Sequence, residues 1–241
     1  MKIITWNCNM AFRRKAAAIL AERPDVLIVP ECEHPDKLRF DASVPPATSV
    51  VWQGTNPNKG LGVFSYGSYS LRLLDLHNLA FRTVLPLQVN GPVGSFTLLA
   101  IWANHPADRD GAYVTQIWKA LQHYPASLLA APVVLAGDFN SNAIWDRPRR
   151  VGNHSDVVRH LAERGIHSAY HRHYQQLHGQ EQHPTWYMYR HADKPYHLDY
   201  CFASQALLDQ LQHVEICDPD KWLRHSDHVP VMVSFADILS S

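Results

Sequence analysis

Short runs of consecutive apolar residues alternate with segments of helical periodicity along much of the chain. Residues 2–6 and 25–29 have the pattern of buried strands, and between them Phe12, Ala16 and Ile19 fall on one face of a helix. The pattern therefore predicts that the chain opens with a strand, a helix and a second strand.

The middle of the chain is rich in Thr, Val, Phe and Tyr, with turn residues between the apolar runs. This composition predicts antiparallel strands at residues 50–53, 62–65, 83–89 and 95–103. The alternation of helix and strand then resumes. It predicts helices at 114–121 and 155–161, strands at 133–136 and 198–203, a short helix after Ser204, and final strands at 214–217 and 229–235.

Strands that are apolar throughout are typical of sheets covered on both faces, so the expected fold class is α/β with helices outside the sheets. No Gly/Ser-rich linker and no change in composition divides the 241 residues. A single domain covering residues 1–241 is therefore expected.

Composition excludes several classes of protein. The chain is 46% hydrophobic with 7 Trp, which excludes a disordered polypeptide. The 22 Lys and Arg balance the 22 Asp and Glu, which argues against coating nucleic acid by charge alone. The 4 cysteines form no CxxC pair, as expected in a reducing compartment. No apolar run approaches the roughly 20 residues of a membrane span, and no secretory segment is evident, so a cytoplasmic protein is expected.

The chemical signal is the set of polar residues at the ends of the predicted strands. They are Asn7 and Asn9, Glu31, Asn104 and His105, Asp138 and Asn140, Asp199, and Asp227 with His228. Each alone reads as an ordinary turn or cap. Together they are costly to bury without a cation, because carboxylates resist desolvation beside one another. Oxygen-rich ligands favour a hard ion, Mg²⁺ with Mn²⁺ as the alternative.

In their order along the chain, the motifs WNxN, a strand ending in Glu, NHP, GDFN, LDY and SDHVPV resemble the endonuclease/exonuclease/phosphatase superfamily over nearly the whole sequence. The resemblance implies a deoxyribonuclease-like, four-layer α/β sandwich, in which two mixed β-sheets pack face to face with helices on the outer faces. It also implies a metal-dependent phosphoesterase cleft along the edges of the sheets.

The resemblance assigns roles to the strand-end residues. It implies catalytic roles for His105, Asp138, Asn140, Asp199 and His228, and metal-binding roles for Asn7, Asn9, Glu31 and Asp227. Asp199 and His228 match the family's Asp–His pair, and Glu31 matches its main metal carboxylate. The general base stays open between Asp138 and His228.

The chain also departs from the family pattern. Pro30 stands where Gln usually precedes the metal Glu, and Met10 stands where Gly follows WNxN. Cys32 and Glu33 occupy the place where abasic-site enzymes often carry a Lys. These departures lead away from the abasic-site branch, whereas the hydrolytic residues are all present.

Three residues are candidates for substrate binding, and each has an ordinary structural alternative. Arg13 either meets a phosphate or serves solubility, and Thr185 and Trp186 form an aromatic loop that either contacts substrate or fills the core. Lys59 is expected in a plain hairpin turn. Nine histidines lie from His154 to His197; a second metal site there lacks a Cys partner, and a solvated, irregular insert is expected.

These residues support three hypotheses. The first is a Mg²⁺-dependent nuclease that hydrolyses DNA by in-line attack of a positioned water. The second is a phosphatase or phosphodiesterase for a small metabolite or a lipid head group, which needs no long basic groove. The third is a non-catalytic binding module. No obligate protein partner is implied.

Overall fold

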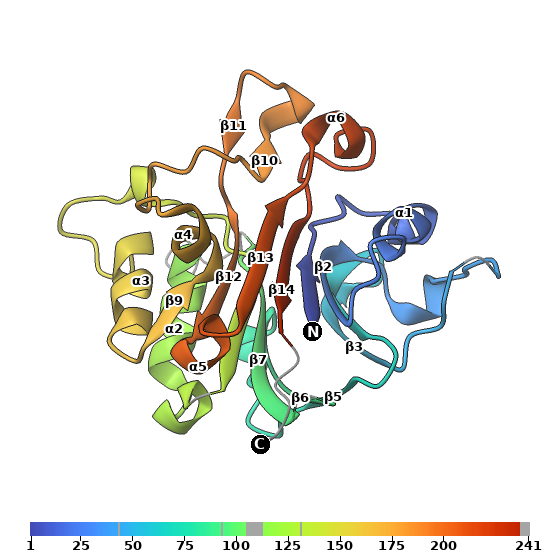
Figure 1. The fold of residues 1–241 in the computed structure, drawn as a ribbon, viewed down its shortest axis with the longest axis horizontal. Coiled ribbons are helices and arrows are strands. Elements are labelled where there is room, and N and C mark those ends of the chain that lie inside the picture. The colour runs from blue at the N-terminus through green and yellow to red at the C-terminus, as the bar shows by residue number, and fades with distance from the viewer. Residues whose placement is uncertain (43, 93, 105–112, 131, 237–241) are drawn as a thin grey trace.

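The computed structural model describes residues 1–42, 44–92, 94–104, 113–130 and 132–236. Two mixed six-stranded sheets pack face to face, and helices lie outside them (Figure 1). This arrangement confirms the predicted four-layer α/β sandwich. Among the described residues, no helix has both the length and the apolar character needed to cross a bilayer.

The first sheet has the strand order β13-β14-β1-β2-β4-β3. Its strands are β1 (Lys2–Thr5), β2 (Val26–Cys32), β3 (Ser49–Asn56), β4 (Lys59–Ser65), β13 (Leu211–Ile216) and β14 (Val231–Phe235). The second sheet has the order β5-β6-β7-β8-β12-β9. Its strands are β5 (Ser70–Leu73), β6 (Val84–Gly91), β7 (Gly94–Trp102), β8 (Val133–Asp138), β9 (Ile166–Ser168) and β12 (Asp199–Ser204).

Helices and one small ribbon complete the fold. The helices are α1 (Ala16–Leu20), α2 (Val114–His123), α3 (His154–Ala162), α4 (Ala169–Tyr174), α5 (Gln205–Leu208) and α6 (Pro219–Trp222). The ribbon pairs β10 (Trp186–Tyr187) with β11 (Pro195–Tyr196), and it projects beyond the ends of the sheets (Figure 1).

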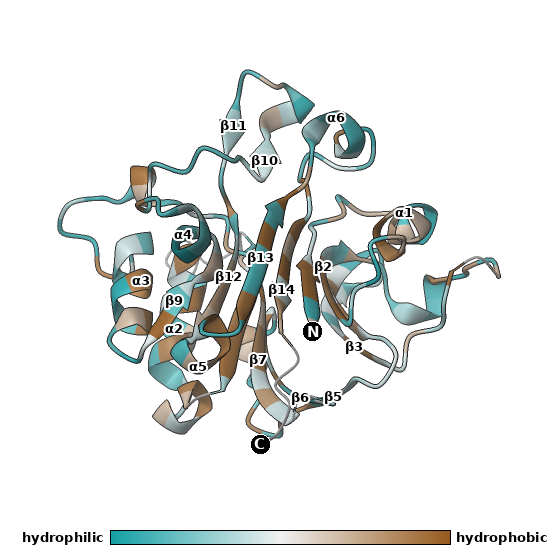
Figure 2. Ribbon diagram, viewed as in Figure 1, coloured by the Kyte–Doolittle hydropathy of each residue, from teal (hydrophilic) through white to brown (hydrophobic). Residues whose placement is uncertain are grey.

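The alternation of side chains along each strand explains why these strands are apolar throughout. In β2, Val26 and Ile28 face the core between the two sheets, whereas Leu27 and Val29 face the core under α1. The second sheet is covered in the same way by α2 and α3. Hydrophobic strands in the interior and more polar helices outside are visible in Figure 2.

Strand pairing brings distant polar residues to one edge of the sandwich. β1 pairs in parallel with β2, and β7 with β8, so the carboxyl ends of these strands lie together within each sheet. The antiparallel strands β12 and β14 begin at the same edges, and Asp199 is directly opposite Asp138. The strand ends that carried the chemical signal therefore converge.

The structure corrects the expected course of the middle of the chain. The predicted antiparallel strands belong to two different sheets, because the chain leaves the first sheet after β4 and enters the second through β5, which the sequence did not predict. β2 also continues past Pro30 and Glu31 to Cys32.

The histidine-rich segment is not the solvated insert that was expected. It contains α3, β9 and α4, and β9 pairs with β12. His154 and His197 are only 1% and 3% exposed. Imidazoles are polar in a sequence pattern, so their burial against the second sheet left no hydrophobic signal to read.

Candidate active site

A cleft of about 690 Å³ opens at the edge where the strand ends meet. Its lining includes residues from both sheets and from the ribbon. Among them are Asn7, Glu31, Lys59, Arg82, Trp102, Asn104, Asp138, Asn140, Trp186, Asp227 and His228. Carboxylate and amide groups thus share one solvent-accessible hollow with basic and aromatic side chains.

Asp138, the last residue of β8, lies at the floor of the cleft. Gly137, the residue before it, allows β8 to pack closely against β7. A Cβ on Gly137 would lie only 1.8 Å from the carbonyl oxygen of Ile101. Asn7 Nδ2 donates to Asp138 Oδ2 at 2.9 Å, and the side chain of Asn140 donates to the same oxygen at 2.9 Å. Burial, reinforced by the nearby Asp199 carboxylate, raises the pKa of Asp138 well above its usual range.

Asp199 and His228 form a buried pair beside Asp138. His228 Nδ1 lies 2.8 Å from Asp199 Oδ2. Burial alone lowers the pKa of an imidazole, but the Asp199 carboxylate, helped by Asp138 and Asp227, raises that of His228 to about 10. His228 is therefore an imidazolium at neutral pH, with Nδ1 held by Asp199 and Nε2 left for other partners.

Glu31 is brought into the cleft by an irregularity in β2. The register with β4 shifts between Pro30 and Cys32, and Glu31 itself has a φ of 63°. A bulge of this kind turns a side chain away from the regular alternation. Glu31 Oε1 accepts from Asn7 Nδ2 at 3.5 Å and lies 3.2 Å from Lys59 Nζ.

The ribbon fixes the far wall of the cleft. Trp186 forms an isolated bridge with His228, and its indole Nε1 donates to Asp227 Oδ2 at 3.0 Å. Ser226 Oγ donates to the carbonyl oxygen of Asn7 at 2.7 Å, which ties the start of the last strand to the end of β1. Residues from the two ends of the chain are thus held on one side of the site.

The residues of the cleft fit a hard divalent cation. The Glu31 carboxylate and the Asn7 amide adjoin Asp138, and Asp227 lines the same cleft, so carboxylate and amide oxygens face one solvent-accessible space. Asp199 Oδ1 is buried without a hydrogen-bond partner among the described residues. Several carboxylates with few donors make a site that a cation would stabilise.

Several predicted site residues occupy other positions. Thr185 is fully buried, and its hydroxyl accepts from the backbone N–H groups of Leu198 and Asp199, so it supports the site from behind. Arg13 pairs with Glu33 away from the cleft lining. Asn9 lines a shallower hollow with Trp186 and Asp227. His105 lies outside the described residues.

Sequence reasoning missed the contribution of Lys59 to the cleft. The hairpin expected there exists, since Asn56 pairs with Lys59 across the β3–β4 turn. The Lys59 ammonium also lies 5.4 Å from the ring centroid of Trp102, besides pairing with Glu31. Both partners are far away in the sequence, so no local pattern pointed to this role.

Comparisons with known proteins give the family and the fold of the chain. A model of the endonuclease/exonuclease/phosphatase family matches residues 4–228. No curated protein matches the chain in sequence. Similar solved structures include a 3′ phosphatase from Neisseria bound to a product DNA hairpin, with a TM-score of 0.62, 19% identity, and coverage of 98% of this chain and 99% of that one.

Two abasic-site (AP) endonucleases are also similar in structure. The Leishmania major enzyme has a TM-score of 0.67 and 18% identity, covering 96% of this chain and 86% of that chain. The Archaeoglobus fulgidus enzyme has a TM-score of 0.64 and 18% identity, covering 98% and 99%. At these identities the likeness establishes the fold.

Proposed function

Because the chain belongs to the endonuclease/exonuclease/phosphatase family, we propose that it is a metal-dependent phosphodiesterase whose substrate is DNA. The observation that carries the proposal is the convergence of Glu31, Asp138 and His228 in one cleft, with Asp199 buried beneath it and paired with His228. Hydrolysis of a phosphodiester requires neutralisation of phosphoryl charge and a water held in line with the leaving oxygen. The cleft contains groups suited to both tasks.

His228 provides positive charge toward the phosphoryl group. Asp199 holds Nδ1 and keeps the ring protonated, so Nε2–H donates to a phosphoryl oxygen. Asp138 is assigned as the general base, because Asn7 and Asn140 orient its carboxylate and its raised pKa suits a proton acceptor. We therefore propose Asp138, rather than His228, as the general base.

Glu31 and Asn7, with Asp227 nearby, are the residues that would hold Mg²⁺ or Mn²⁺. When bound, such an ion supplies positive charge to a phosphoryl oxygen and to the leaving oxygen. Lys59 is paired with Glu31 and adds a fixed cation at the same edge.

A second hollow beside the cleft supports a polynucleotide substrate over a small ester. It has a volume of about 1070 Å³, shares Asn140 and Trp186 with the cleft, and is lined by Arg147 and Arg150. Trp145, which is 44% exposed, lies 5.0 Å from the Tyr196 ring, and Tyr196 lies 5.7 Å from Trp186. Basic groups beside a row of neighbouring aromatic rings suit phosphates and bases beyond the scissile bond.

The test is hydrolysis of four substrates with Mg²⁺ or with EDTA. They are supercoiled plasmid, a duplex with an abasic site, a duplex with a 3′ phosphate, and bis-p-nitrophenyl phosphate. We expect DNA hydrolysis with Mg²⁺ and none with EDTA. Glu31→Gln is expected to raise the Mg²⁺ concentration needed by at least about tenfold, because it removes a carboxylate ligand.

Glu163→Gln is the matched control, since the Glu163 side chain is 63% exposed and lies on the outer helix layer. It should leave the Mg²⁺ requirement unchanged. DNA hydrolysis that persists in EDTA would contradict metal dependence. Hydrolysis of the small ester alone would support the alternative of a small-molecule phosphodiesterase, and inactivity on all four substrates would support a binding module.

A further inference from the structure

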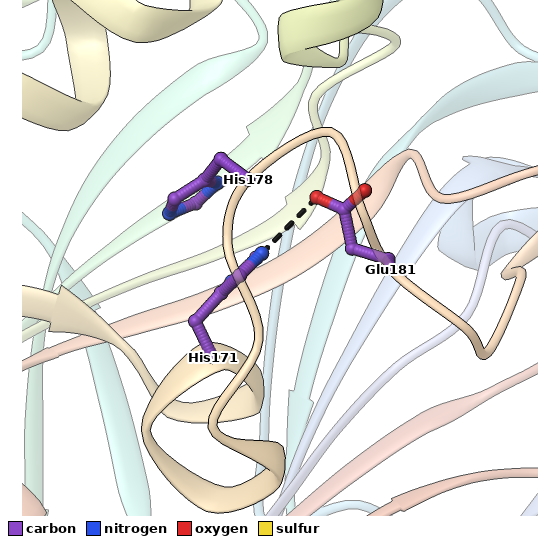
Figure 3. Close-up of side chains that lie close together, drawn as sticks. All are labelled: His171, His178 and Glu181. Atoms are coloured by element: carbon purple, nitrogen blue, oxygen red, sulfur yellow. Dashed lines mark hydrogen bonds and ion pairs between the residues drawn. The ribbon is translucent and has the colours of Figure 1, made fainter.

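A second cluster of imidazole and carboxylate groups lies apart from the cleft lining. His171 belongs to α4, and His178 and Glu181 lie on the loop that follows it (Figure 3). His154, the first residue of α3, completes the group, which we call the histidine cluster. The side chains of His171 and Glu181 are only 8% and 3% exposed.

Two pairs of polar atoms in this cluster lie at distances that fit neighbouring metal ligands. His171 Nε2 lies 3.0 Å from Glu181 Oε1, and His154 Nε2 lies 3.3 Å from His178 Nδ1. One ligand atom from each of His171, His178 and Glu181 lies within 4.8 Å of the others. Neighbouring ligands of a tetrahedral zinc ion are about 3.3 Å apart, given Zn–N distances near 2.0–2.1 Å.

The outer atoms of the same side chains are held by a second layer of polar groups. Ser141 Oγ lies 2.9 Å from His154 Nδ1, and Ser168 Oγ lies 2.8 Å from His171 Nδ1. Both histidines therefore turn Nε2 toward the cluster. Oxygen partners at the outer ring nitrogen are the usual support of metal-binding histidines.

The Glu181 carboxylate of the cluster is also held by hydrogen bonds. Asn142 Nδ2 donates to Glu181 Oε2 at 3.0 Å, and the backbone N–H of Gly179 donates to both carboxylate oxygens. Burial alone raises the pKa of Glu181, but these donors and His171 lower it below its usual value. A charged carboxylate among mostly neutral imidazoles is a set of ligands that needs no deprotonation at neutral pH.

We propose that His171, His178 and Glu181, with His154 as the fourth ligand, bind one Zn²⁺ or a similar transition-metal dication. Nitrogen-rich donors suit such an ion, whereas the oxygen-rich cleft suits Mg²⁺. The ion joins α3, α4 and the following loop, and Asn142 links Glu181 to the segment just after Asn140. The ion therefore stabilises the segments that support the cleft residues, and it takes no part in phosphoester chemistry.

One ring must turn when the ion binds. The rings of His171 and His178 are stacked, with centroids 3.6 Å apart and planes 20° apart, so their nitrogens do not converge as they stand. His178 lies on the loop after α4 and is only partly buried, so we assign this rotation to His178. Ion binding should accordingly change the near-ultraviolet circular dichroism, since the ring centroids of Tyr200 and Phe202 lie 6.2 and 6.0 Å from that of His178.

The test uses the full chain without an affinity tag, stripped of metal by a chelator that is then removed. Zn²⁺ binding is measured by calorimetry and by elemental analysis, and Co²⁺ is added as a spectroscopic probe. We expect one equivalent of Zn²⁺, visible Co²⁺ bands typical of tetrahedral coordination, and a rise in Tm with Zn²⁺. His171→Ala and His178→Ala should weaken Zn²⁺ binding by at least about 100-fold.

Two matched variants make the result specific. His173→Ala removes an exposed histidine of α4 and should bind Zn²⁺ like the wild type. Glu31→Gln, in the cleft, should also bind Zn²⁺ normally, which separates this proposal from the proposed function. Equal binding by His178→Ala, loss of Zn²⁺ in Glu31→Gln, or less than about a tenth of an equivalent on the wild type would overturn it. Because His178 is on a loop, its variant stays informative even if His171→Ala fails to fold.

Discussion

Two clusters of histidine and carboxylate adjoin the start of β12, and they hold protons in opposite ways. In the cleft, His228 faces Asp199 and Asp138, and its pKa is raised to about 10. In the histidine cluster, Glu181 is one carboxylate among several imidazoles. Burial lowers the pKa of His154 to about 4 and, with its neighbouring imidazoles, that of His178 to about 3.

The comparison teaches that burial alone does not decide the charge of a histidine. Both groups are largely removed from water, so desolvation lowers the pKa in each. The number of carboxylates relative to imidazoles then decides whether the histidine is charged or neutral. Three carboxylates, with Asp199 the most important, keep His228 cationic and suited to a phosphoryl group, whereas the neutral histidines offer nitrogen lone pairs that suit a metal.

The largest effect should come from removing the reacting groups of the cleft. We predict that Asp138→Asn and His228→Ala each lower turnover on DNA by at least about 10², the usual contribution of a positioned acid or base. Steady-state hydrolysis checks this, with circular dichroism to establish that both variants are folded. Wild-type turnover from folded variants would remove these two assignments.

Asp199→Asn tests the source of the charge on His228. Removing the carboxylate should lower the pKa of His228, so the alkaline limb of the pH–rate profile should move to lower pH. At pH 8 we expect turnover to fall by about 10- to 100-fold, with a smaller loss near pH 6. An unchanged alkaline limb would show that Asp199 does not set the protonation of His228.

The raised pKa of His228 also predicts how the stability of the protein changes with pH. A folded-state pKa raised from about 6.5 to about 10 stabilises the protein fully below pH 6.5, and this contribution is lost as the pH rises toward 10. The lowered pKa values of His154, in the histidine cluster, and of buried His197 beside it act in the opposite sense. Their contribution is present above about pH 6.5 and is lost as the pH falls toward 4.

Urea unfolding without metal separates the two clusters. It should be measured on Asp138→Asn, because protonation of Asp138 in the folded state stabilises the protein at acid pH and masks the effect. Between pH 7.5 and pH 5 the free energy of unfolding should fall by at least about 2 kcal/mol, as buried His154 and His197 become protonated on unfolding. A flat profile would mean that these histidines are not held neutral.

The smallest effect is expected at the basic hollow beside the cleft. Arg147→Ala with Arg150→Ala should weaken DNA binding about tenfold and reduce the slope of log K against log salt by up to about 1.8. Hydrolysis of bis-p-nitrophenyl phosphate should not change. Arg72→Ala, which removes an exposed arginine of β5, is the control. If the double variant binds DNA as tightly as the wild type, the polynucleotide does not bind at this hollow.

The strand pattern predicted an α/β fold with polar residues at the strand ends, and the resemblance to the family supplied the two-sheet sandwich and the meeting of those residues. Strands such as β8 are short, apolar and followed at once by polar groups, so Asp138 had to lie at a sheet edge. The structure brings Glu31 and His228 to the same cleft as Asp138, and buried Asp199 pairs with His228. Their catalytic roles stay predictions until they are measured.

The remainder depended on tertiary contacts that have no local pattern. Lys59 reads as a turn residue, and only the bulge in β2 places Glu31 beside it. His154 is separated from Glu181 by 27 positions, and polar side chains gave no sign of burial. Arg13 looked free to meet a phosphate because Glu33, its partner, is 20 positions away.

The most direct test is the anomalous diffraction of Mn²⁺ in a crystal soaked with Mn²⁺ and a short DNA. We predict a strong peak in contact with the Glu31 carboxylate, with a DNA phosphate between that ion and His228. Manganese bound away from Glu31, with the DNA remote from Asp138 and His228, would contradict the proposed phosphodiesterase.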